Sequence, residues 1–305
     1  MSVENSNANL IQTSVSNVSC VPAKNPLFVP WGNALRLRPI IKSGQFFPVY
    51  ITGLTGTGKT EMVEQICAIE GRELFKLSIT QETDEDDLIG GMILQDGSSS
   101  FRVGPVLLAM QRGAVLFLDE IDLASSKILC LQDVLDGKPV YSKKLNQWIS
   151  PAPGFTVIAA ANTRGQGDET DKYVGTSILN EAFLERFMVM MHQPYAPPAI
   201  EEKILVKLWA DVVGEVDDDA RDFISKLLVW AQNTRKVYEN NEFTDLISTR
   251  RLVAAIKCYN AFKSRRDAVE LVVERFDAFT RQAFIDFYKA VDESFEESES
   301  VLETE

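Results

Sequence analysis

The sequence predicts an α/β fold: a five-stranded parallel sheet with helices on both faces and hairpin insertions, followed by a small all-α domain. Between residues 46 and 194, short and nearly all-apolar segments alternate with helical patterns, which is typical of a parallel sheet covered on both faces. After residue 194 and the Pro197-Pro198 pair, the sequence has helical periodicity alone. We therefore expect two compact parts.

The apolar segments define the expected strands, at residues 49–52, 74–80, 114–118, 155–161 and 187–191. Turn signals between them, including Asp96-Gly97, predict hairpins at 92–104 and 139–151. Helices of the second part are expected at 201–213, 218–238, 249–264 and 268–290. The expected domains are a flexible N-terminus at 1–25, an α/β domain at 26–195, a helical lid domain at 196–291 and an acidic tail at 292–305.

Composition excludes several classes of function. The formal net charge of the 305-residue chain is -13, so nucleic acid is a poor default partner. His192 is the only histidine, and the four cysteines are far apart in sequence, which disfavours zinc or histidine-based catalysis and fits a reducing compartment. The N-terminus lacks signal-peptide features, and no apolar run approaches the roughly 20 residues of a membrane span. We expect a cytoplasmic protein without membrane segments.

A phosphate-binding loop follows the first expected strand. Residues 53–60, GLTGTGKT, match the pattern G-x-x-x-x-G-K-[ST] between a strand and a helix. In this setting the curled backbone and the helix N-terminus point N–H groups at phosphate oxygens. Lys59 is expected to reach the β- and γ-phosphates, and Thr60 to bind magnesium. The other expected nucleotide-binding residues are Gly53, Thr55, Gly56, Thr57 and Gly58.

Two carboxylates follow the apolar segment 114–118. Asp119 and Glu120 are expected at the carboxyl edge of the sheet, where ligands bind in open α/β folds. Asp119 would hold magnesium, and Glu120 would orient and deprotonate the attacking water. The alternative is that both residues only cap a following helix.

Asn162 and Arg186 are further candidates. Asn162 ends the segment 155–161 and can hydrogen-bond the attacking water or the γ-phosphate, although an asparagine there is also a common turn residue. Arg186 precedes the last expected strand and can complete the site of a neighbouring subunit. The alternative for Arg186 is a surface ion pair with Glu185 or Glu181.

Arg250 and Arg251 occupy the first turn of an expected helix, after the cap Ser248-Thr249. The helix dipole disfavours cations there, so binding an anion such as the γ-phosphate would explain them. Pairing with Asp245 or Glu242 is the alternative. We favour Arg250 over Arg251 as the phosphate contact.

These motifs resemble those of AAA+ ATPases: Walker A at 53–60, Walker B at 119–120, sensor 1 at Asn162, the arginine finger at Arg186 and sensor 2 at Arg250. The stretches 87–90, 101–105, 118–123 and 161–163 are similar to the MoxR-like branch, with its insertion in the second helix. The stretches 165–168, 175–176 and 180–183 look most like the ATPase subunit of aerobic cobaltochelatase (CobS-like), including phage-encoded members.

The resemblance implies ATP and Mg²⁺ as cofactors and a homo-oligomer, a ring of six subunits, in which Arg186 acts on the adjacent subunit's ATP. It also implies a partner with a von Willebrand-type domain and a large chelatase subunit that inserts cobalt into a corrin ring. A phage-encoded member would work in the host cytoplasm. The short polar segment before the first strand leaves little room for a further docking domain.

The expected function is an ATP-hydrolysing motor that remodels or activates a protein partner, such as the ATPase subunit of a cobaltochelatase-like complex. One alternative is a nucleic-acid motor of the helicase or clamp-loader type, for which Lys143 and Lys144 would supply a local basic ring. Others are a MoxR-type chaperone with a von Willebrand-domain partner unrelated to cobalt, and a nucleotide-binding scaffold without turnover.

Overall fold

The computed structural model describes residues 19–95, 98–165, 167 and 175–295, which form two compact units. The first unit consists of Gly32–Gly53 and Gly58–Gln193, with the described part of Met1–Lys24. The second consists of Asn25–Trp31, Leu54–Thr57 and the described part of Pro194–Glu305. Three short segments of the expected α/β domain, 26–31, 54–57 and 194–195, therefore group with the helical unit.

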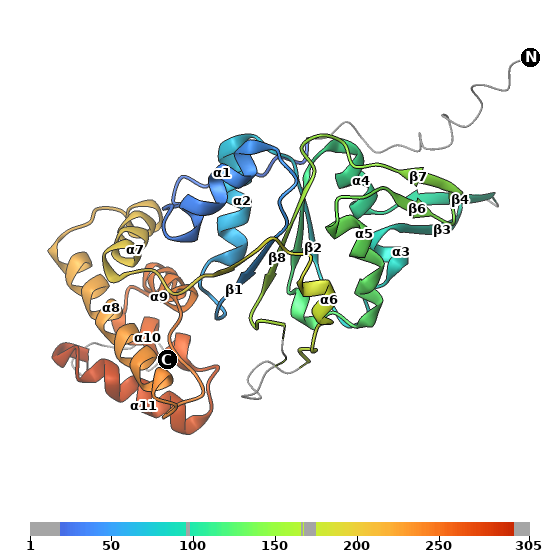
Figure 1. Cartoon of the computed structure of the whole chain (residues 1–305). Coiled ribbons are helices and arrows are strands. Elements are labelled where there is room, and N and C mark those ends of the chain that lie inside the picture. Colours follow the sequence, from blue (N-terminus) through green and yellow to red (C-terminus); the bar gives the residue numbers. More distant parts are fainter. Residues whose placement is uncertain (1–18, 96–97, 166, 168–174, 296–305) are drawn as a thin grey trace, which may run out of the picture. The chain divides into compact units, whose positions relative to one another are not determined.

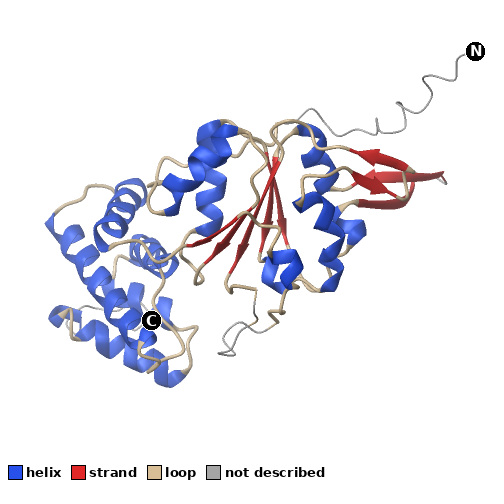
Figure 2. Cartoon of the chain, in the orientation of Figure 1, coloured by secondary structure: helices blue, strands red, loops and turns tan. Residues whose placement is uncertain are grey.

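The first unit contains the predicted five-stranded parallel sheet, so the expected fold class is confirmed (Figures 1 and 2). Its strands are β1 (Val49–Thr52), β2 (Leu74–Ser78), β5 (Val115–Asp119), β8 (Thr156–Ala161) and β9 (Val189–His192), in the spatial order β2-β5-β8-β1-β9. All their pairings are parallel. In register, Thr52 lies opposite Ala161, and Asp119 lies opposite Ser78. The loops after β1, β5 and β8 therefore begin at one edge of the sheet, the edge where open α/β sheets bind ligands.

Helices cover both faces of this sheet (Figure 1). They are α1 (Asn33–Ser43), α2 (Lys59–Glu70), α3 (Glu85–Leu88), α4 (Pro105–Arg112), α5 (Gln132–Leu135) and α6 (Glu181–Leu184), with 3-10 turns η1 (Ile121–Leu123) and η2 (Ser126–Leu131). The sequence analysis did not predict α1. Its signal is present, since Leu37 and Ile41 are four residues apart and fully buried, and Gly44 ends the helix in a left-handed conformation.

Both predicted hairpins are present as separate antiparallel pairs, β3 (Gly90–Gln95) with β4 (Ser98–Val103) and β6 (Val140–Ser142) with β7 (Gln147–Ile149). Several large apolar side chains on them are exposed, among them Leu94 and Trp148. The Lys144 ammonium forms an ion pair with Asp86 beside the start of the first hairpin.

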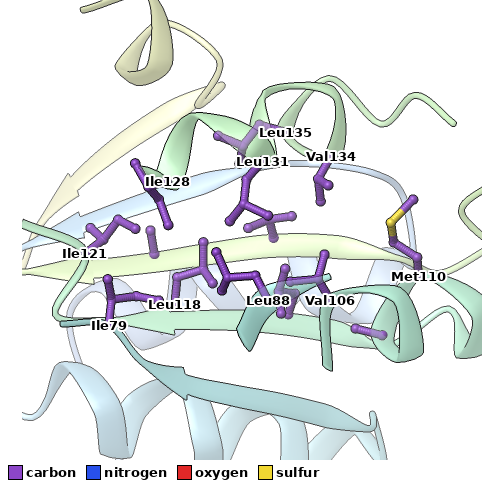
Figure 3. Close-up of a cluster of buried hydrophobic side chains, with 14 of the residues drawn as sticks. Ile79, Leu88, Val106, Met110, Leu118, Ile121, Ile128, Leu131, Val134 and Leu135 are labelled. Atoms are coloured by element: carbon purple, nitrogen blue, oxygen red, sulfur yellow. The ribbon is translucent and has the colours of Figure 1, made fainter. Parts of the chain in front are cut away.

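Alternation along the strands explains the core. Leu116 and Leu118 of β5, with Val157 and Ala159 of β8, face a cluster formed with α4, α5 and η2. Figure 3 shows part of this cluster, including Leu88, Val106, Met110, Leu118, Ile121, Ile128, Leu131 and Leu135. The intervening residues are also fully buried, as expected for a sheet with both faces covered.

Arg72 fixes the opposite edge of the sheet. Its Nη1 donates to the Ile41 carbonyl at 2.8 Å, and its Nη2 donates to the carbonyls of Gly113 (3.1 Å) and Gly154. A Cβ on Gly113 would lie 2.2 Å from the Pro153 carbonyl oxygen, so only glycine permits this approach. One guanidinium thus joins the end of α1 to the loops that precede β5 and β8.

The second unit is helical: α7 (Pro198–Val212), α8 (Asp218–Glu239), α9 (Thr249–Phe262), α10 (Arg265–Val273), α11 (Ala278–Lys289) and the 3-10 turn η3 (Glu293–Phe295). The prediction of one helix at 268–290 was wrong, because the chain turns between α10 and α11. Asp277 causes the second start, since its carboxylate accepts the N–H groups of Phe279 and Thr280. No described helix is long and apolar enough to cross a membrane.

The first residues of the expected acidic tail pack into this unit. Asp292 is 1% exposed, and its carboxylate binds Lys226 at 3.0 Å and Arg265 at 3.5 Å. Phe295 packs against Tyr288. The compact unit therefore extends at least to residue 295, and residues 296–305 of the expected tail lie outside the described residues.

Candidate nucleotide site

The phosphate-binding loop connects β1 to α2. Gly58 is the N-cap of α2 with φ 83°, a left-handed conformation that glycine adopts without strain. The first N–H groups of a helix lack partners within the helix, and together with the helix dipole they favour an anion. The 12-residue helix α2 therefore offers a phosphate-binding N-terminus at the residues that the motif predicts.

Lys59 lies at the centre of this end of the first unit. Its Nζ donates to the Gly53 carbonyl at 2.6 Å and to Asn162 Oδ1 at 3.0 Å, and the residue is 8% exposed. The structure thus brings Asn162, from the end of β8, beside the lysine of the loop. The Gly53 carbonyl and the Asn162 amide oxygen are both neutral, so these two contacts leave the positive charge of the ammonium available to phosphate oxygens.

Thr60 and Asp119, the two expected magnesium ligands, are in direct contact. The Thr60 hydroxyl donates to Asp119 Oδ2 at 2.9 Å, across the gap between α2 and the end of β5. Mg²⁺ prefers oxygen ligands and takes one or two from a protein while keeping several waters. A hydroxyl and a carboxylate side by side fit this preference.

Lys76 is a residue of this site that the sequence analysis missed. It lies in the middle of β2, and its Nζ is 3.7 Å from Asp119 Oδ2 and 3.0 Å from Glu64 Oε1. A lysine inside an otherwise apolar strand was the available signal. It places a positive charge next to the carboxylate expected to hold a cation.

Glu120 directly follows β5 and is exposed. Its φ is 58°, in the left-handed region that a non-glycine residue adopts at a cost. Among the described residues, its carboxylate has no hydrogen bond or ion pair. This arrangement differs from the helix-capping alternative, since η1 begins after Glu120 without a side-chain cap.

Asp122 supports the position of Asn162. Its Oδ2 accepts the N–H groups of Asn162 at 3.0 Å and Thr163 at 2.9 Å, and the residue is fully buried. Burial, and then the charge of Asp122, raises the pKa of Tyr50 far above its usual range, so the phenol remains protonated. The sequence analysis did not select Asp122, although its spacing of two residues from Glu120 was the available signal.

Arg186 does not pair with Glu185 or Glu181 within the described residues. Instead its Nε lies 3.2 Å from Asp136 Oδ1, and its Nη1 donates to the Ala182 carbonyl. Asp136 follows α5, and no motif or spacing pointed to it as a site residue.

Arg250 belongs to the second unit, as do the loop residues Leu54–Thr57. Within that unit, a Cβ on Gly56 would lie 2.8 Å from Ser248 Cβ and 3.6 Å from Arg250 Cβ. Tyr195 also donates to the Thr55 carbonyl at 2.7 Å. These contacts bring the first turn of α9 beside residues of the phosphate-binding loop.

The two arginines of this turn differ in their surroundings. Arg250 is exposed, whereas Arg251 is half-buried, and burial followed by the charges of Arg275 and Arg250 lowers the pKa of Arg251. In the described chain, neither arginine forms an ion pair with Asp245 or Glu242. The alternative explanation for Arg250, a structural ion pair with one of these residues, is therefore not supported.

A buried ion pair supports the start of α9. Arg235 binds Glu201 through two hydrogen bonds of 2.9 and 2.8 Å, and its guanidinium lies 4.1 Å from the centroid of the Tyr195 ring. The Thr249 hydroxyl donates to Glu201 Oε1 at 2.5 Å. The pair therefore connects α7, α8 and α9 to Tyr195.

A parallel sheet with a strand, a glycine-rich G-K-T loop and a helix, next to a strand ending in two acidic residues, defines a P-loop nucleotide-binding protein. Comparison with known proteins specifies the family. Residues 48–204 match the AAA domain of the dynein-related subfamily, so the chain belongs to that family.

Three relatives show the extent of the similarity. The chain is 28% identical over 211 residues to the aerobic cobaltochelatase subunit CobS of Sinorhizobium sp, which covers 67% of this chain and 63% of that protein. It is 30% identical over 235 residues to YojN of Bacillus subtilis, covering 75% and 72% respectively. It is 33% identical over 152 residues to SSP1341 of Staphylococcus saprophyticus, covering 47% and 54%. The chain thus spans less than two thirds of the length of two of these relatives.

Proposed function

We propose that this chain hydrolyses ATP with Mg²⁺ and uses the energy to remodel or activate a protein partner. The observation that carries the proposal is the contact of Thr60 with Asp119 beside the contact of Lys59 with Asn162. Four residues expected to act on one triphosphate, from three separate segments, lie together at one edge of the sheet. Membership of the AAA domain family supports nucleotide binding.

Each residue has a distinct part in this proposal. Lys59 and the first amides of α2 bind the phosphates, while Thr60 and Asp119 hold magnesium, which neutralises charge on the phosphate oxygens when bound. Glu120 orients and deprotonates the attacking water, and Asn162 keeps that water in line through its amide. Glu120 is suited to this part because its carboxylate is exposed and has no described partner.

The remaining residues act in an assembly. In a ring of six copies, Arg186 of one subunit neutralises charge on a neighbour's transferred phosphoryl group, which is worth on the order of a thousandfold or more in rate elsewhere. Arg250 contacts the γ-phosphate, so that the helical unit responds to the nucleotide. Both roles remain proposals for this chain.

Two classes of partner are candidates. Similarity to a cobaltochelatase subunit supports a role in a chelatase-like complex in the cytoplasm. A von Willebrand-domain partner unrelated to cobalt is the second candidate. A nucleic-acid motor is disfavoured by the net charge of -13 and by the pairing of Lys144 with Asp86, which weakens the local basic ring expected of the second hairpin.

The test is steady-state MgATP hydrolysis across a range of protein concentrations, with the size of the assembly measured on the same samples. Specific activity that rises as larger assemblies form supports a shared site. Mixing wild type with Arg186→Ala should then reduce turnover more than in proportion to the mutant added. ATP binding without turnover at any concentration, with or without DNA, would contradict an autonomous motor.

A further inference from the structure

The Arg186 guanidinium contacts its own chain through Nε and Nη1, while part of the side chain is exposed. Its Nε is buried and lies 3.2 Å from Asp136 Oδ1, an ion pair that lacks the alignment of a hydrogen bond, so Nε has no hydrogen-bond partner in the described part of the chain. Its Nη1 donates to the Ala182 carbonyl one turn earlier. The side chain as a whole is nevertheless 26% exposed. A guanidinium has five N–H donors in a rigid plane, so two fixed contacts determine where the remaining donors point.

Asp136 is itself held firmly. Its N–H donates to the Gln132 carbonyl at 3.1 Å, at the end of α5. The next residue, Gly137, has φ 66°, and a Cβ there would lie 2.9 Å from the Phe46 ring. The turn that carries the carboxylate therefore packs against Phe46, and the positive φ and this contact both favour glycine at position 137.

The second oxygen of Asp136 has another partner. Lys138 Nζ lies 2.8 Å from Oδ2, and the Lys138 side chain is 63% exposed. The carboxylate thus lies between two cations, and the three side chains together carry a net positive charge. The group as a whole therefore still attracts an external anion.

We propose that Asp136 is a positioning residue for Arg186: it fixes the Nε side of the guanidinium so that the opposite edge is presented to the nucleotide of a neighbouring copy of this chain. This inference rests on the proposed role of Arg186. An arginine that must reach across a subunit boundary benefits from being fixed beforehand, because a long free side chain would lose its rotamer freedom in each transition state. Asp136 does not touch the nucleotide itself.

The test compares Asp136→Asn with Asp133→Asn, which removes the same charge from the same short helix but has no side-chain contact with Arg186. Asp136→Asn should lower kcat by about tenfold, within the roughly hundredfold range for small misplacements of a catalytic group, while KM for ATP and assembly size stay unchanged. Asp136→Glu should recover part of the loss. Asp133→Asn should match wild type, and melting temperatures of all variants identify any that are misfolded.

A double variant separates positioning from general stability. If Asp136 acts through Arg186, then Asp136→Asn adds no further loss in kcat to Arg186→Ala. The same comparison is made on binding of ADP with aluminium fluoride, a mimic of the transferred phosphoryl group, so the test does not depend on full turnover. Asp136→Asn should weaken that binding and leave binding of ADP alone unchanged.

The outcomes are distinguishable. Wild-type turnover and analogue binding in Asp136→Asn, with both lost in Arg186→Ala, would overturn the positioning role and leave the proposed function standing. Faster turnover in Asp136→Asn would mean that the carboxylate restrains Arg186 instead of presenting it. Wild-type behaviour in Arg186→Ala itself would remove the proposed role of Arg186, and with it this inference.

Discussion

Lys59 Nζ lies 3.0 Å from Asn162 Oδ1, although 103 residues separate them in sequence. The contact exists because β1 and β8 are neighbours in the sheet, with Thr52 opposite Ala161, so the residues that follow both strands meet. The strand pairing thus brings the Asn162 amide to the lysine that the loop motif assigns to phosphate binding.

Lys59→Ala should weaken ATP binding by about 10- to 100-fold, because a hydrogen bond to a charged group contributes roughly 1.5–3 kcal/mol. Isothermal titration with a non-hydrolysable ATP analogue measures the change. Lys42→Ala, an exposed lysine at the end of α1, is the control and should bind as wild type does. Equal affinity of the two variants would remove Lys59 from the phosphate site.

Glu120→Gln and Glu120→Gly should separate chemistry from backbone strain. Both should bind ATP and lose about 10²- to 10⁴-fold in kcat, the usual contribution of a general base. Only Glu120→Gly should also raise the free energy of unfolding, by about 1 kcal/mol, because glycine adopts φ 58° without the cost that a side chain adds. Denaturant titration and turnover on the same preparations test both statements. Full turnover in Glu120→Gln would exclude it as the base.

Lys76→Met should lower the magnesium concentration needed for half-maximal turnover by about two- to fivefold. The Lys76 ammonium, 3.7 Å from Asp119 Oδ2, competes with the cation, and partly exposed pairs contribute about 0.2–1 kcal/mol. Magnesium titration at fixed ATP measures the effect, with Lys42→Met as the charge-matched control. A higher magnesium requirement would indicate that Lys76 helps to shape the site.

Asp122→Ala should destabilise the first unit by about 2–4 kcal/mol, because the N–H groups of Asn162 and Thr163 lose their acceptor and each unsatisfied group costs roughly 1–3 kcal/mol. Turnover of the folded fraction should fall as Asn162 loses its support. Chemical denaturation and kcat are the measurements, and Asp133→Ala, at an exposed position of α5, is the control. A kcat equal to that of wild type would show that Asn162 is positioned by other contacts.

Glu201→Ala should cost about 3–5 kcal/mol of stability in the helical unit, since it leaves Arg235 as an uncompensated charge with little exposure. Its neighbour Glu202 is exposed, so Glu202→Ala should change the unfolding midpoint very little. A double replacement of Glu201 and Arg235 by methionine should recover most of the loss. Similar midpoints for Glu201→Ala and Glu202→Ala would contradict the importance of the pair.

The sequence predicted structure best where a pattern of residues is compatible with few other structures. Apolar strands such as 155–161 and the glycines and lysine of residues 53–60 predicted the sheet and the phosphate loop, since few other structures require those patterns. The sequence analysis missed helix α1 and the break before α11 because the signal for each is common in sequences. For α1 it is two apolar residues four positions apart, Leu37 and Ile41, and for α11 it is the single N-cap Asp277.

The residues that support the site could not be predicted from the sequence, for a different reason. Asp122, Lys76 and Asp136 act through partners about 40 to 50 residues away, and only the sheet order and the turn after α5 bring those partners within reach. A carboxylate on a predicted loop carries no sign of which backbone it will hold. Likewise the left-handed φ of Glu120, just before η1, is not a preference of glutamate and has no sequence signal.

The Arg72 guanidinium donates hydrogen bonds to the carbonyls of Ile41, Gly113 and Gly154. These bonds hold together the edge of the sheet opposite the one that carries Lys59 and Glu120. The contacts that stabilise the sheet at Arg72 and the residues proposed for catalysis therefore lie at opposite ends of the same strands. Substitutions in the loops around Arg72 that keep Gly113 and Gly154 would therefore change the thermal stability of the sheet without altering the residues of the nucleotide site.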